Sequence, residues 1–86
     1  MIDIQPLSIL REIDRTGSLT QAADRLNLTQ SAVSHAIRRF EERHGVKLWE
    51  REGHKLRLTL AGEYLLGLAM RVLPQLERGA AVLEDY

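Results

Sequence analysis

The spacing of apolar residues predicts three helices in the first half of the chain. Apolar side chains recur every three or four residues in three successive stretches, which is the period of helices that bury one face. These stretches are residues 3–16, 19–26 and 30–44. Only about three residues separate the second stretch from the third, a link typical of a helix-turn-helix.

The ends of these helices carry residues that suit helix termini. Gly17 and Gly45 follow the first and third stretches, and glycine readily adopts the left-handed conformation past a helix end. Ser18 and Thr29 precede the second and third, where a hydroxyl can accept a free backbone N–H. Ser18 with Gln21 also fits a capping box, in which each side chain satisfies the other residue's backbone donor.

After Gly45 the apolar period changes to every second residue. Residues 48–51 and 56–59 are expected to pair as a short hairpin, or wing, with residues 52–55 as its turn. Thr59 is expected to cap a last helix of roughly 25 residues. The predicted fold is mainly α, a winged helix-turn-helix with a three-helix core and a two-stranded β-hairpin. We expect residues 1–58 to form this domain and residues 59–86 a linker and dimerisation helix.

The last helix carries two adjacent apolar stripes. One repeats at alternating spacings of four and three, as in helices that pair in a coiled coil. We expect it to form a homodimer interface through Leu65, Ala69, Val72, Leu76 and Leu83. The other stripe, containing Leu73, would then cover the domain's own body, although both stripes could instead be buried within one chain. Pro74 either bends this helix or separates two helices.

The composition of the chain excludes some kinds of site and indicates the type of ligand. Cysteine is absent, which excludes disulfides and thiolate metal sites. No stretch resembles a signal peptide or reaches the roughly 18 apolar residues of a membrane span, so we expect a soluble cytoplasmic protein. The net charge is zero, but residues 35–57 contain seven Lys or Arg, four Asp or Glu and all three histidines. Because salt confines fields to about 8–10 Å, such a local surplus can attract a polyanion.

The third helix has a polar side without carboxylates. Opposite the expected buried stripe of Val33, Ile37 and Phe40 lie side chains that can hydrogen-bond to base edges in a major groove. They are Gln30, Ser31, Ser34, His35 and Arg38. The alternative is an ordinary solvated face, but such faces usually mix acidic and basic residues, as residues 41–43 do. We therefore expect this side to contact double-stranded DNA.

The wing supplies the remaining candidate contacts. Lys55, with His54 beside it at the tip, is expected to contact DNA phosphates, the alternative being a plain hairpin turn. Arg51 could contact phosphate or pair with Glu50 or Glu52, and the sequence does not decide between them.

Catalysis finds no support in the sequence. The three histidines are not spaced as metal ligands, and Ser34 and His35, as helix neighbours, point about 100° apart. No glycine-rich phosphate loop is present. We expect no enzymatic activity, cofactor or metal. The main alternative function is a protein-interaction or dimerisation module without DNA binding, which the neutral net charge and the acidic last third would suit.

An ordered set of motifs resembles the N-terminal domain of LysR-type transcriptional regulators. The matching residues are 18–26, 29–34, 40–45, 48, 50–51 and 58–62. The resemblance implies a winged helix-turn-helix with a linker helix that pairs two subunits. It also implies groove-reading roles for Gln30, Ser31, Ser34 and His35 and a wing contact at His54. We expect two copies to bind an interrupted inverted repeat in DNA.

Two positions depart from the family's usual pattern. The family most often has Pro where Ser31 stands and Arg where His35 stands, which makes base preference harder to infer. Residues 31–35, with residues 71–76 later, are similar to the MetR branch, activators of methionine-biosynthesis genes. The family's effector-binding domain is not in this sequence, so we expect no small-molecule effector to bind these residues.

Overall fold

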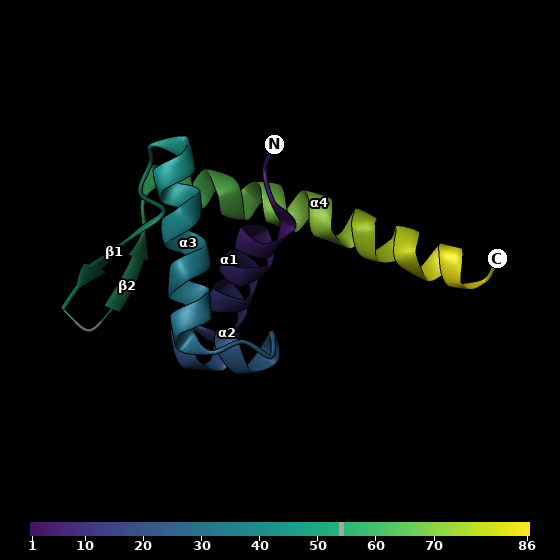
Figure 1. Ribbon diagram of the computed structural model, residues 1–86, viewed down its shortest axis with the longest axis horizontal. Coiled ribbons are helices and arrows are strands. Elements are labelled where there is room, and N and C mark those ends of the chain that lie inside the picture. Colours follow the sequence, from purple (N-terminus) through teal and green to yellow (C-terminus); the bar gives the residue numbers. More distant parts are fainter. Residues whose placement is uncertain (54) are drawn as a thin grey trace.

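A computed structural model describes residues 1–53 and 55–86. These residues form four helices and one two-stranded sheet (Figure 1). In chain order the elements are α1 (Ile4–Thr16), α2 (Leu19–Arg25), α3 (Gln30–His44), β1 (Trp49–Glu52), β2 (Lys55–Leu58) and α4 (Leu60–Glu84). The predicted winged helix-turn-helix followed by a long helix is confirmed. None of the helices in the described part of the chain has the length and apolar character needed to cross a membrane.

The helix ends follow the local rules, with one difference. Gly17 ends α1 at φ 71°, and the Thr29 Oγ1 accepts the backbone N–H of Ala32 at 3.0 Å. The Ser18 Oγ accepts the N–H of Gln21 at 3.2 Å, which is half of the predicted capping box. The other half is replaced, because the Ser18 N–H donates to the Thr16 Oγ1 (3.3 Å) instead of to the Gln21 side chain.

One core joins all four helices. Its buried side chains come from α1, α2, α3, α4 and the segment before β1. They are Leu7, Ile9, Leu10, Ala23, Val33, Ile37, Phe40, Leu48, Leu65, Ala69 and Leu73. Asn27, in the turn between α2 and α3, has φ 56°, a left-handed conformation that Asn tolerates better than most residues. The core thus fixes α3 with its stripe of Val33, Ile37 and Phe40 inside, as predicted.

The wing is a hairpin that projects from the helical body beside α3 (Figure 1). Its strands pair antiparallel, with Trp49 opposite Leu58 and Glu52 opposite Lys55. Glu52 and Lys55 were expected in the turn, but they form the last pair of the ladder. Each strand is therefore displaced by one residue from its predicted range, and Gly53 at φ 64° begins a tighter turn.

The last helix is continuous from Leu60 to Glu84 and contains Pro74 in its interior. It therefore does not end near Leu73 and restart, which was one of the two possibilities left open. Its first half lies across α1, whereas its second half extends away from the body (Figure 1).

The burial of α4 corrects the predicted dimer interface. Leu65 is 3% exposed and Ala69 is 0% exposed, and both belong to the chain's own core together with Leu73. Their assignment to a partner is wrong, because α1 already covers this part of α4. Val72 is half-buried, and Leu76 and Leu83 are exposed. A boundary between residues 58 and 59 would accordingly divide a single core.

Candidate nucleic-acid interface

The polar side of α3 faces outward, as the helical period predicts. Gln30, Ser31, His35 and Arg38 are exposed, and Ser34 is half-buried. They occupy this side because the opposite stripe of α3 is locked into the core. None of the five predicted side chains is enclosed by the fold, so their hydrogen-bonding groups remain available to a ligand.

These five side chains line one open groove. Its other lining residues are Leu19 at the start of α2, Ala32 on α3 and Arg51 on β1. Two arginines lie in the groove, and among the described residues that line it there is no carboxylate. A surface rich in hydrogen-bond donors and free of acidic groups suits a polyanion with readable edges.

The start of α3 adds positive potential to the same place. The first backbone N–H groups of a helix carry partial positive charge, and the first turn of α3 has no acidic residue to neutralise it. Thr29 caps the N–H of Ala32, and Gln30 and Ser31 occupy the turn that borders the groove. An anionic group is therefore favoured at this end of α3.

Arg51 connects the groove to the wing. It lines the α3 groove and also a second hollow between the wing and the start of α2, which contains Lys55. The carboxylate of Glu52 pairs with Arg57 across the hairpin at 2.9 Å. Across residues 1–53 and 55–86, Arg51 itself makes no ion pair. The sequence left open whether Arg51 contacts phosphate or pairs with Glu50 or Glu52. The structure favours the first role, because Arg51 faces the candidate interface and not an acidic partner.

The two predicted wing residues have different outcomes. Lys55 is exposed at the start of β2, in the second hollow with Gly17, Ser18 and Arg51. It therefore lies next to the α3 groove and not inside it. His54 lies outside the described residues, so its predicted contact stays a prediction.

Glu41 is a positioning residue that the sequence reasoning missed. Its Oε2 accepts the backbone N–H of Leu48 at 2.8 Å, and its side chain is only 10% exposed. The Lys47 Nζ lies 3.8 Å from its other oxygen. Glu41 had been grouped with a solvated face of mixed charge, but it holds the segment that leads into β1. The single sequence signal for this role was its place in the family motif.

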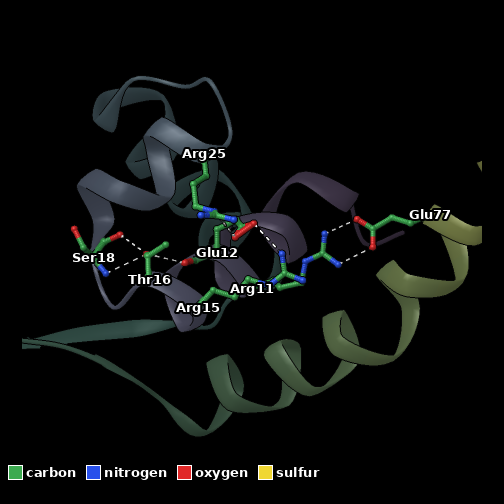
Figure 2. A network of polar contacts seen from close by, with 7 residues as sticks. All are labelled: Arg11, Glu12, Arg15, Thr16, Ser18, Arg25 and Glu77. Carbon is green, nitrogen blue, oxygen red and sulfur yellow. Dashed lines mark hydrogen bonds and ion pairs between the residues drawn. The ribbon is translucent and has the colours of Figure 1, made fainter.

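A polar cluster ties α1 to α2 (Figure 2). The buried carboxylate of Glu12 accepts a hydrogen bond from Arg15 at 3.1 Å and lies 3.6 Å from the Nε of Arg25. The Thr16 hydroxyl donates to the Glu12 backbone carbonyl at 2.8 Å and accepts the N–H of Ser18. These contacts hold both ends of α2 against the C-terminal part of α1, and the start of α2 in turn borders the groove.

Comparison with known proteins identifies the family. Residues 4–63 match the model of the bacterial regulatory helix-turn-helix proteins of the lysR family. The chain belongs to this family. The matched residues run from the start of α1 into the first turn of α4, so they include the whole candidate interface and the wing.

Individual members of the lysR family are also similar to this chain. The chain is 46% identical over 78 residues to the HTH-type transcriptional regulator MetR of Salmonella typhimurium, covering 91% of this chain and 25% of that protein. For MetR of Haemophilus influenzae the identity is 45% over 74 residues, covering 86% and 24%. The CbnR DBD–DNA complex superposes with a TM-score of 0.80 at 26% identity, covering 98% of this chain and 97% of that one. The chain thus spans about a quarter of the length of these curated relatives.

Proposed function

We propose that this chain binds double-stranded DNA sequence-specifically, as the DNA-binding part of a LysR-type transcriptional regulator. The observation that carries the proposal is the groove on α3, where five hydrogen-bonding side chains gather beside Arg51 without a carboxylate. The family of regulatory helix-turn-helix proteins and the similarity to a domain solved with DNA support the same reading.

In this proposal α3 enters the major groove with its N-terminal half. Gln30 can form two hydrogen bonds to adenine, Ser34 can bond to either type of base edge, and Arg38 favours guanine or phosphate. His35 can donate to a guanine acceptor or to a phosphate. Ser31 lies in the first turn of α3, near the positive end of the helix, and suits a phosphate or base edge.

The wing contributes sequence-independent affinity. Lys55 and Arg51 flank the second hollow, and their charges are available to phosphates on the neighbouring backbone. Each phosphate neutralised by such a side chain releases counterions, which makes binding sensitive to salt. The wing thereby strengthens and orients binding, while α3 distinguishes sequences.

A homodimer through the second half of α4 would place two such domains on one duplex. Leu76, Val82 and Leu83 are 46%, 55% and 70% exposed, on the part of α4 that extends beyond the body. Apolar side chains spaced by about seven residues on a projecting helix are suited to pairing with a second helix. Two α3 helices would then enter successive major grooves of an interrupted inverted repeat.

The proposal extends to the branch of the family. The chain shares 44–46% identity with MetR regulators of Salmonella typhimurium, Haemophilus influenzae and Escherichia coli. The segment Ser31–His35, which forms part of the groove, is also the segment that resembles this branch. We therefore infer that the target sites lie near genes of methionine biosynthesis.

Selection of bound duplexes from a random pool tests the function directly. The expected result is a motif with two inverted half-sites, with apparent affinity that falls steeply as salt rises. Binding without salt dependence, or no binding at any salt concentration, would instead favour the protein-interaction module as the function.

Variants then separate base readout from backbone contact. Gln30→Ala and Ser34→Ala should weaken binding to the selected site by roughly 5- to 150-fold, the range of one base contact worth about 1–3 kcal/mol. They should weaken binding to random duplex much less. Lys55→Ala should weaken binding to both the selected and the random duplex, and should reduce the slope of log affinity against log salt concentration by about one. Gln5→Ala, which removes an exposed amide of α1 that lines neither hollow, is the matched control and should change neither. Equal losses on selected and random DNA would contradict base readout by α3.

A further inference from the structure

One ion pair joins residues far apart in the sequence, Arg11 of α1 and Glu77 of α4. The Arg11 Nη1 donates to the Glu77 Oε1 at 2.9 Å, and its Nη2 donates to Oε2 at 2.7 Å (Figure 2). The side chain of Arg11 is 10% exposed, whereas that of Glu77 is 59% exposed. Two parallel bonds fix the relative orientation of the two groups more narrowly than a single bond does. The pair therefore constrains geometry between α1 and α4.

The pair lies just past the point where α4 leaves the core. Leu73 is the last core side chain of α4, and residues 75–86, which we call the arm, are all exposed. Pro74 stands between the core and the arm and has no N–H to donate to the carbonyl of Met70. The helix is thus weakest where the arm begins, and Glu77 ties the arm back to α1 from beyond that point.

Within the described residues, this pair is the sole hydrogen bond or ion pair between the arm and an element other than α4. The other side-chain bond of the arm, from Gln75 to the Arg71 carbonyl, stays within α4. Arg11 is kept available for Glu77 because the neighbouring carboxylate of Glu12 is directed to Arg15 and Arg25. The hydrogen bonds from Arg11 also hold the pKa of Glu77 below its ordinary value, which keeps the carboxylate charged.

We propose that the Arg11–Glu77 ion pair sets the direction of the arm and thereby the separation of the two DNA-binding domains in a homodimer. The second half of this statement rests on the proposed function. At about 1.5 Å per residue, Glu84 lies roughly 16 Å along the helix from Leu73. A swing of about 10° at Pro74 would move that end by about 3 Å, close to the rise of about 3.4 Å per base pair. The ion pair thus controls which half-site spacing the dimer accepts.

The direction of the arm is measurable within one chain. The protein contains no cysteine, so cysteines introduced at Gln21 and Ala81 take spin labels at those two positions alone. Both positions are exposed, and Ala81 lies on the side of α4 away from Leu76 and Leu83. Double electron–electron resonance on labelled chains diluted with unlabelled protein reports the distance between α2 and the arm.

Three variants in this labelled background separate a positioning role from a structural one. Glu77→Gln should broaden or shift the distance distribution by at least about 3 Å, the displacement of a 10° swing. Arg11→Met keeps an apolar stem of similar length in the core and leaves the exposed Glu77 carboxylate to water, so the chain should stay folded with a modestly lower unfolding midpoint and should broaden the distribution equally. Glu84→Gln is the matched control, one heptad further on the same side of α4, and should change neither. An unaltered narrow distribution in Glu77→Gln and Arg11→Met would overturn the proposal, as would a broad one in the unsubstituted chain.

Duplexes with half-sites at graded spacings test the consequence for DNA. The unsubstituted protein should prefer one spacing, and Glu77→Gln should accept spacings one or two base pairs away with less discrimination. A distribution that broadens with no change in spacing preference would refute the link to half-site separation. If no duplex binds at all, the proposed function fails, while the label distances still decide whether the ion pair directs the arm.

Discussion

Gly62, in the first turn of α4, is a position where a single methyl group should disrupt the contact between α4 and the wing. A Cβ at Gly62 would lie 3.0 Å from the carbonyl carbon of Leu48, 3.3 Å from the Cδ2 of Leu58, and nearer still to the Leu48 oxygen. That oxygen accepts the backbone N–H of Thr59 at 3.0 Å, so it cannot move aside without weakening this bond. Gly62→Ala must therefore push two segments of backbone apart.

The effect of Gly62→Ala on the free energy of unfolding is the sum of opposing contributions whose sizes are known. Alanine is favoured over glycine in a helix interior by about 0.8–1.0 kcal/mol. Weakening the Thr59 hydrogen bond costs about as much, so these two terms nearly cancel. Overpacking then remains, at about 1–3 kcal/mol. Gly62→Ala should lower the free energy of unfolding by this amount, which for a domain of this size lowers the Tm by at least about 4 °C.

Two other glycines of α4 serve as controls in the same helix. A Cβ at Gly67 would meet only the flexible end of Arg71, at 3.7 Å, and a Cβ at Gly79 would meet nothing within 4 Å. Alanine at either position should raise the free energy of unfolding by about 0.8–1.0 kcal/mol. Urea denaturation followed by circular dichroism, at one protein concentration, measures all three. If Gly62→Ala is stabilised as much as Gly67→Ala, the close approach to Leu48 is not a constraint and the reasoning fails.

Two further predictions concern hydrogen-bonded carboxylates. Glu41→Ala leaves the N–H of Leu48 without its partner and should lower the free energy of unfolding by about 1–3 kcal/mol in urea denaturation. Glu41→Gln keeps an acceptor oxygen and should lower it less. Equal losses in the two variants would show that this hydrogen bond does not explain the effect. The pKa of Glu77 in the folded chain lies below its ordinary value of 4.5, because Arg11 donates hydrogen bonds to it. Its contribution to stability is therefore complete at neutral pH and is lost as the pH falls through that lowered pKa. Unfolding midpoints from about pH 6 to pH 3 should converge for the unsubstituted chain and Glu77→Gln, and a constant difference between them would contradict this.

The local chemistry of the chain was sufficient to predict most of the fold and the main face of the candidate site. Helix ends at Gly17 and Gly45, caps at Ser18 and Thr29, and the outward side of α3 all depend on residues within about one helical turn. The period of apolar residues decides which side of α3 is buried, and with it the exposure of the polar side chains opposite. Such features can be predicted because their causes lie next to them in the sequence.

Some features of the site needed the folded chain. The hydrogen bond of Glu41 to the backbone before β1, and the place of Arg51 in a corner between α3 and the wing, depend on how the hairpin packs. In the sequence, the neighbours of both residues are those of an ordinary surface helix or strand. Their roles became visible only when α3, the wing and α2 were placed together.

By itself, the sequence determined the order and type of the elements, the ends of the first three helices to within one residue, the membership of α3 in a helix-turn-helix, and the polar character of its outer side. Tertiary structure alone decided which part of α4 is covered by the body. Two apolar stripes ran along this helix, and the packing of α1 placed Leu65 and Ala69 inside while it left Leu76 and Leu83 outside. The ion pair between Arg11 and Glu77 could not be predicted from the sequence either, because 66 positions separate the two residues. Local spacing sets the period of each helix, but which face is buried depends on the surfaces that distant segments bring against it.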